Sequence, residues 1–394
     1  MLALAPLILI QAASATMNFD AVAPSAIEQL DQTITVFGRS LKSSKEALDR
    51  CLARSCSPAE DIQSSIEHAE NQLIAGELRA ARTTLLQSRD RNKRYAQSLP
   101  GLVSRLLYFD AEVASLLGLA DYSRIGTIDS LSALKAGLPP DDPRIAAQRL
   151  LVADVFLREG RNVTAVKMYD AIAERAAESG WPEIQGAAMF RALTFYAMAA
   201  SVEPAYRSQA QRRYAALRAT TSSSMRPARD ATALLEAKLA VLSNKSADID
   251  TIMAKAGAAR TATPMLVFMP QINLSTTIAR SGVVTPAVTR DQWVDFSFRI
   301  TPEGKVADAE ITNSAKKVNM QWVGQVQEAL VERRYLPLDL PSDSAGLWRR
   351  ERFMIVADLT APKGSRIRTQ SGVPRTRSID LTARMDAGAP GAPP

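Results

Sequence analysis

The chain has 394 residues and a net charge of +7, and its composition is 46% hydrophobic and 23% charged. This length exceeds what a single hydrophobic core usually organises, so we expect two or three domains. The composition is that of a globular protein and excludes disorder throughout. The basic excess is largest in residues 360–394, which carry six Lys and Arg residues against two Asp residues. We interpret this tail as a solvated segment, with weak contact to an anionic surface as the alternative.

Residues 1–15 have the pattern of a secretory signal peptide. An apolar run of suitable length is followed by Ala13-Ser14-Ala15, a small-residue pattern typical of a cleavage site. The run is short for a membrane-spanning helix, which needs ~20 apolar residues. We therefore expect an exported, periplasmic protein that is cleaved near Ala15.

The chain contains two cysteines, Cys51 and Cys56. In an exported protein this spacing predicts a local disulfide, and two small apolar thiols at a helix junction are the alternative. A zinc site is not expected, because the chain has no further cysteine and a single histidine, His68. Ser57 and Glu60 form a capping-box pattern, with Pro58 at the first helical position. The disulfide would therefore join the end of one helix to the start of the next.

Residues 16–260 are predicted to be almost entirely helical, with breaks at Gly and Pro. A spaced pattern of a small residue, a turn residue, a second small residue and an apolar residue recurs within them. The two clear copies are Ala69, Gly76, Ala81 and Leu85, and Ala153, Gly160, Ala165 and Tyr169, with a weaker third copy at Ala237, Asn244, Ile249 and Met253. The pattern predicts helical hairpins, in which small residues allow close packing and Gly or Asn ends the first helix.

This pattern resembles the tetratricopeptide repeat (TPR), although the 84-residue offset is not a multiple of the usual ~34. We therefore expect a TPR-like array with irregular or elongated hairpins between the copies, and a generic helical bundle is the alternative. Such arrays bind peptides or proteins on an extended surface. A basic run over residues 79–94 is interpreted as a solvated face, or as a clamp for an acidic peptide.

The stretch Trp293 to Pro337 predicts a different, smaller domain. Alternating apolar residues indicate a strand over 293–300, and Thr301 to Gly304 is typical of a tight turn before a second strand. The apolar period then becomes helical after Asn319, and a third apolar strand follows over 352–359. Residues 261–291 form a proline-containing connector before this domain.

This order of hairpin, helix, Arg-Tyr-Leu-Pro and strand resembles the C-terminal domain of TonB-type energy transducers, over residues 292–359. The matching residues are Phe296, Phe298, Ile300, Gly304, Val306, Ile311, Ser314, Ala329, Arg334, Tyr335 and Pro337. The resemblance implies that the last strand offers an open edge to which an extended segment of a partner adds. The strand residues expected to bind in this way are Arg352, Phe353, Met354, Ile355, Val356 and Ala357. Arg349, Arg350 and Arg352 would keep that edge from pairing with itself.

No motif of nucleotide binding, metalloprotease or serine hydrolase chemistry occurs in the chain. His68 is expected to pack or to face solvent, and nothing selects a catalytic pair of carboxylates. We therefore expect no enzyme activity, no cofactor, no metal, no small-molecule substrate and no specific nucleic-acid partner.

Together these patterns predict an α+β multidomain protein: a TPR-like helical array, a connector, a small β-β-α-β domain at 292–359 and a partly disordered tail at 360–394. The expected function is a periplasmic protein-interaction scaffold with a TonB-like docking domain, linked to outer-membrane receptor or transport systems. The main alternative is a peptide-binding adaptor in which the C-terminal domain is only structural. An energy transducer proper and a carboxylate enzyme are more distant alternatives.

Overall fold

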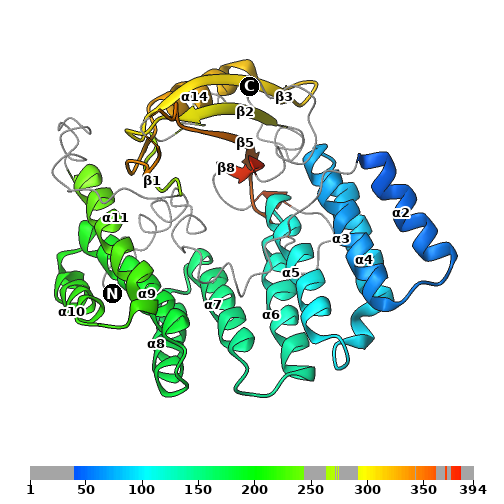
Figure 1. Ribbon diagram of the computed structural model, residues 1–394, viewed down its shortest axis with the longest axis horizontal. Coiled ribbons are helices and arrows are strands. Elements are labelled where there is room, and N and C mark those ends of the chain that lie inside the picture. The colour runs from blue at the N-terminus through cyan, green and yellow to red at the C-terminus, as the bar shows by residue number, and fades with distance from the viewer. Residues whose placement is uncertain are drawn as a thin grey trace.

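A computed structural model describes residues 40–243, 263–270, 272, 274, 292–341, 343–360, 369–370 and 374–382. Within these ranges an all-α array is followed by a small antiparallel β-domain with one helix, which confirms the predicted fold class. Helices of the array stand side by side in a curved row, and the sheet lies along one side of that row, over the ends of its helices (Figure 1). The signal-peptide and cleavage-site predictions fall outside the described residues.

Proline is the first residue of every second helix from Pro58 to Pro182, and short turns join the helices of the array. They are α2 (Leu41–Ala53), α3 (Pro58–Ile74), α4 (Leu78–Asn92), α5 (Pro100–Leu116), α6 (Ala120–Gly137), α7 (Pro143–Arg158), α8 (Asn162–Glu178), α9 (Pro182–Val202), α10 (Arg207–Arg218) and α11 (Arg226–Ser243). The predicted capping box is present, with Ser57 and Glu60 bonded reciprocally at the start of α3. No helix in the described ranges has the length and apolar content to cross a membrane.

Three consecutive hairpins contain the same type of turn between their two helices. We call them hairpin 1 (α3–α4), hairpin 2 (α5–α6) and hairpin 3 (α7–α8). Gly76, Gly118 and Gly160 end the first helices, each with a positive φ between 72° and 82°. In each of these turns the glycine N–H donates to the carbonyl three residues earlier, and the N–H of the next residue donates to the carbonyl five residues before it. This is the Schellman arrangement, which satisfies carbonyls at the end of a helix.

The hairpins recur every 42 residues, so the hairpin between the two clear copies is elongated relative to the usual ~34 residues, as expected, but it is regular rather than irregular. Hairpin 2 lies midway between them and repeats the same positions as Ala111, Gly118, Ser123 and Thr127. Ser123 and Thr127 stand where the other copies have alanine and a large apolar residue, yet both are buried. The Thr127 hydroxyl donates to the Ser123 carbonyl, which satisfies it inside the helix. In the weak third copy, Ala237 lies in α11, while Asn244, Ile249 and Met253 fall outside the described residues.

The β-domain is built on a four-stranded antiparallel sheet in the order β3-β2-β5-β8. Its elements are β1 (Leu266–Phe268), β2 (Trp293–Ile300), β3 (Val306–Ser314), α14 (Met320–Val331), β4 (Arg334–Tyr335), β5 (Leu347–Val356), β6 (Leu359–Thr360), β7 (Thr369–Gln370) and β8 (Arg375–Asp380). Helix α14 covers one face, where Trp322, Phe296 and Phe353 share a core. The predicted turn is present, since the Gly304 N–H donates to the Thr301 carbonyl.

The predicted open edge is not an edge. Strand β5 is central in the sheet and pairs with β2 on one side and with β8 on the other. Strand β8 comes from the segment assigned to the tail, so the sheet continues beyond residue 359. The chain itself has supplied the strand that a partner was expected to add. The outer strands among the described residues are β3 and β8.

The N-terminal side of the β-domain also extends past its predicted boundary. Strand β1, within the assigned connector, pairs with β4 and contacts α11. Trp348 and Ile311 are 46% and 44% exposed, so these two large apolar side chains lie outside the core of the domain. Strand β3 is bulged, and Asp308 within it has a positive φ, which turns its later residues outward.

Candidate functional site at the junction of array and sheet

The β-domain is locked to the end of hairpin 1 by Arg352. This side chain is fully buried and forms a double hydrogen bond with Asp295, at 2.7 and 2.9 Å. It also donates to the carbonyls of Leu73 and Ile74, at 2.6 and 2.7 Å, where α3 ends. A cation at the C-terminal end of a helix is favourable, because the carbonyls there carry partial negative charge. The strand residue predicted to face a partner therefore serves an internal contact.

Trp293 completes this contact by packing on the turn of hairpin 1. Its ring lies 3.9 Å below the Arg352 guanidinium. A Cβ atom placed on Gly76 would come within 2.6 Å of the indole, so only glycine admits the ring at this distance. Trp293 is thus held between the β-domain and the turn of hairpin 1.

The turn of hairpin 2 makes an equivalent contact with the next part of the sheet. The Leu359 N–H donates 2.7 Å to the Gly118 carbonyl, and a Cβ on Gly118 would lie 1.9 Å from the Ala357 carbonyl oxygen. The Arg377 guanidinium of β8 donates 2.6 Å to the Ser115 hydroxyl. Two successive repeat turns therefore hold one sheet.

A groove of about 540 Å³ remains beside these contacts, and we call it the junction groove. The residues that line it are Gly76, Glu77, Leu78, Arg79, Ala80, Arg82, Thr83, Leu86, Leu116, Leu117, Leu119, Gln292, Trp293, Met354, Ile355, Val356, Ala357 and Leu359. Most of them are apolar, and its charged side chains come only from α4 and the residue before it. Sequence reasoning missed this groove, because its walls come from two segments far apart in the chain, within residues 76–119 and 292–359.

The basic run of α4 is neither a solvated face nor a clamp as a whole. Arg82 and Arg89 both approach the buried Asp110 of α5, each at 3.5 Å. Arg91 makes two 2.7 Å hydrogen bonds to Asp61 of α3. Three of the six basic residues therefore join helices within the array.

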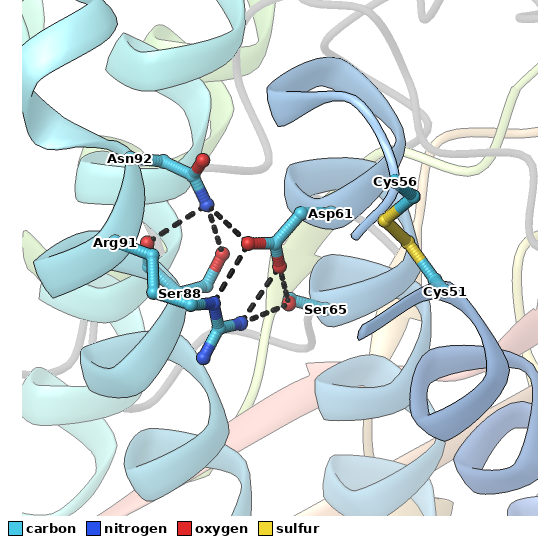
Figure 2. A network of polar contacts seen from close by, with 7 residues as sticks. All are labelled: Cys51, Cys56, Asp61, Ser65, Ser88, Arg91 and Asn92. Carbon is cyan, nitrogen blue, oxygen red and sulfur yellow. Dashed lines mark hydrogen bonds and ion pairs between the residues drawn. A yellow bond between two sulfur atoms is a disulfide. The ribbon is translucent and has the colours of Figure 1, made fainter. Parts of the chain in front are cut away.

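Figure 2 shows the polar network around Asp61 between α3 and α4. Asn92 donates 2.7 Å to the same carboxylate and Ser65 donates 3.0 Å. Burial acts to raise the pKa of Asp61, but the bonds from Arg91, Asn92 and Ser65 outweigh it and hold that pKa below its ordinary value. At Asp110 burial dominates instead and raises the pKa, although Arg82 and Arg89 oppose it.

A second surface begins at the rim of the groove. The Arg82 guanidinium lies 4.7 Å over the ring of Tyr122, which is 47% exposed on α6. Ile125 on α6 and Val163 on α8 are 48% and 71% exposed. Val163 is equivalent to the position before Tyr122 at 42-residue spacing, so the three lie on the same side of successive second helices. We call Tyr122, Ile125 and Val163 the second-helix face.

Cys51 and Cys56 are joined in a disulfide, visible in Figure 2 beside the Asp61 network. The bond spans the C-terminal turn of α2, in which Ser55 has a positive φ of 53° and the Cys56 N–H donates to the Cys51 carbonyl. These are the two positions that usually share a hydrophobic contact in a Schellman turn. His68 is buried and lies 3.0 Å from the Ser44 hydroxyl of α2, so α2 is held at two points.

The other residues predicted from the sequence lie mainly in the protein core or at contacts between its two domains. Of the predicted edge residues, Phe353 and Ile355 belong to the core under α14, while Met354 and Val356 pack on Leu78 of hairpin 1. Ala357 is buried at the turn of hairpin 2. Of the family-pattern residues, Val306 and Tyr335 are buried, Ser314 ends β3 and Arg334 begins β4, three residues before Pro337. All eight residues of the two clear repeat copies lie at the expected helices and turns.

Among the described residues, no group of three or more His, Cys, Asp or Glu side chains is placed to hold a metal ion. Comparison with known proteins adds little to this picture. No protein family and no curated protein matches the chain.

Two crystal structures of nearly identical TPR-like repeats from Podosopora anserina, assigned as a kinesin light chain, match part of the array. One of them carries the Q17M substitution. They share 15% and 14% identity with this chain, cover 51% of it and are themselves covered to 94% and 95%. Their TM-scores of 0.39 and 0.38 are too low to carry an argument, so the array is defined by its own hairpin geometry.

Proposed function

We propose that this protein is a non-enzymatic protein-interaction scaffold, exported to the cell envelope, whose helical array binds a partner protein at the second-helix face. The observation that supports this most directly is the row of exposed apolar side chains on α6 and α8. Tyrosine beside arginine is the composition typical of binding hot spots, and exposed apolar rows commonly mark interaction sites.

The β-domain has a supporting role in this proposal. Its central strand is paired on both sides, its inner face rests on hairpins 1 and 2 and β1 contacts α11, so it supports the curved row of helices at both ends. This favours an adaptor over a TonB-like dock in which β5 captures the partner. The resemblance of residues 292–359 to TonB-type domains still supports a partner from an outer-membrane receptor or transport system.

Site-specific crosslinking tests the proposed surface. A photoreactive amino acid at Ile125 is expected to form one dominant crosslink in cells that express the protein, and the same group at Val202 is not. Val202 is a matched control, because it is 47% exposed and lies on α9, away from the second-helix face.

Purification of the crosslinked partner then allows a direct affinity measurement. Tyr122→Ala should weaken its binding by about 10- to 100-fold, since truncated hot spots typically cost 2 kcal/mol or more. Equal loss in Val202→Ala, or no loss in Tyr122→Ala, would exclude this surface. Cell fractionation tests export: recovery of the protein in the cytoplasm with residues 1–15 intact would contradict that part of the proposal.

A further inference from the structure

We propose that the junction groove binds a single-chain aliphatic carboxylate, with its chain between the two domains and its carboxylate at Arg79. This site is separate from the second-helix face, and the inference does not depend on the proposed partner binding. The three features that support it are the apolar walls, the pairing of the backbone around the groove and the charge at one end.

The walls form an apolar slot contributed by both domains. Leu78 of hairpin 1 packs on Met354 and Val356 of β5, with Leu116 of hairpin 2 against them, and these side chains together with Leu86 form the apolar part of the lining. The volume of about 540 Å³ lies within the range of roughly 300–1,000 Å³ that is usual for small-molecule sites. Such a slot favours an aliphatic chain, because burying apolar surface on both sides of the chain is favourable.

The backbone around the slot argues against an extended peptide. Strand β5 is hydrogen-bonded along both edges, to β2 and to β8. Beyond its end, the Leu359 N–H is bonded to hairpin 2. A peptide would therefore bring buried amides without a strand edge to pair with, and unpaired buried amides are costly. An alkyl chain has no such groups to satisfy.

The charge at one end of the slot selects an anion. Arg79 is exposed and has no ion-pair partner among the described residues, whereas the charge of Arg82 is shared with Asp110. The acid in the lining is Glu77, and Arg79 is the lining cation that no acidic side chain among the described residues pairs with. Hairpin 2 has Asp121 at the position of Arg79, and it pairs with Arg124 at 2.7 Å.

Arg79 also stands in the first turn of α4, where the helix dipole is positive and a basic residue is unfavourable. A carboxylate beside it would offset both charges. A cationic or uncharged head group would gain nothing from this end of the groove.

Isothermal titration calorimetry of the full chain tests the ligand class with three probes of equal chain length, the two ionic probes kept below their micelle concentrations and the alcohol below its solubility limit. We expect dodecanoate to bind, dodecan-1-ol to bind at least about tenfold more weakly and dodecyltrimethylammonium to bind more weakly still. No heat from dodecanoate up to about 1 mM, or affinity for the cation equal to that for dodecanoate, would overturn the proposal.

Two variants with matched controls test the position. Arg79→Glu should lower dodecanoate affinity about tenfold or more while leaving dodecan-1-ol unchanged, and Arg94→Glu, on the short helix after α4, should not. Thr83→Phe fills the groove and should abolish binding of both probes, whereas Gln87→Phe, one turn along α4 and outside the lining, should not.

Circular dichroism checks that each variant folds, and Arg79→Glu carries the test if Thr83→Phe does not. Dodecanoate affinity that is unchanged in Arg79→Glu, or lowered equally in Arg94→Glu, would place the carboxylate elsewhere and overturn the proposal.

Discussion

At the scale of single residues, backbone conformation determines which residue type is favourable at several helix ends, independently of side-chain chemistry. Ser55 has a φ of 53° at the end of α2, where the same turn in hairpins 1 to 3 has glycine. A residue with a Cβ atom is strained in this region, while glycine is not.

We therefore expect Ser55→Gly to stabilise the protein by about 0.5–1 kcal/mol, since glycine relieves the strain but gives more freedom to the unfolded chain. Urea unfolding with the disulfide intact measures this change. Ser132→Gly, at an exposed position within α6, is the control and should destabilise by about 1 kcal/mol. Destabilisation by Ser55→Gly would show that the serine side chain stabilises the turn.

Gly118 and Gly180 separate backbone strain from domain contact, because both have a φ of 72°. A Cβ on Gly118 would meet the Ala357 carbonyl at 1.9 Å, whereas a Cβ on Gly180 would meet nothing within 4 Å. Gly180→Ala should cost about 1 kcal/mol from strain alone. Gly118→Ala should cost about 2 kcal/mol or more, because the sheet must also move away. Equal free energies of unfolding for the two variants would mean that the turn of hairpin 2 does not hold the sheet.

At the scale of elements, the polar network of Asp61 joins α3 to α4 and makes their packing depend on pH. The pKa of Asp61 is lowered in the folded protein. Its contribution to stability is therefore complete above the unfolded pKa of about 3.9 and is lost as the pH falls through the folded value.

Asp61→Asn should destabilise the protein by about 1–3 kcal/mol at pH 7, because Arg91 loses its charged acceptor. The difference from the natural chain should shrink below about pH 4, when the carboxyl of that chain becomes protonated. Denaturant unfolding between pH 3 and pH 7 measures both effects, with the exposed Asp90→Asn as control. A difference that stays constant down to pH 3 would contradict an ionised Asp61 as the source.

At the scale of the whole molecule, Arg352 joins the two domains into one folded body. It is buried with Asp295 and two helix carbonyls, so its removal leaves those carbonyls without this donor and Asp295 with only the 3.5 Å bond from Arg350. Breaking a buried pair in this way typically costs 3–5 kcal/mol.

We expect Arg352→Met to lower the melting temperature of the β-domain and to split the calorimetric transition into two. Arg349→Met, which breaks a more exposed pair with Asp380, should leave a single transition. A single unshifted transition in Arg352→Met would show that the domains do not depend on this contact.

Much of this fold was predictable because short sequence patterns indicate where its helices, strands and turns begin and end. The Gly turns, the Ser57 capping box and the change from alternating to helical period each act within a few residues, so their positions agree with the structure. The regular 42-residue repeat was missed, because hairpin 2 has the polar residues Ser123 and Thr127 where the repeat pattern requires a small and a large apolar residue. The Thr127 hydroxyl can be buried there because it bonds to a carbonyl of its own helix.

The sequence by itself determined the succession of elements: helical hairpins, then a β-hairpin, a helix and a strand. Only the tertiary structure decided which strand lies at the edge and which charges are internal. Strand pairing joins residues far apart in the chain, so no local sequence pattern indicates that β5 pairs with β8. Arg352 was predicted to prevent self-pairing of an exposed strand edge. In the structure it is bound by carbonyls of α3, nearly 280 residues earlier in the chain. Hydrogen-bond partners depend on distance in space, and periodicity along the chain does not encode that distance.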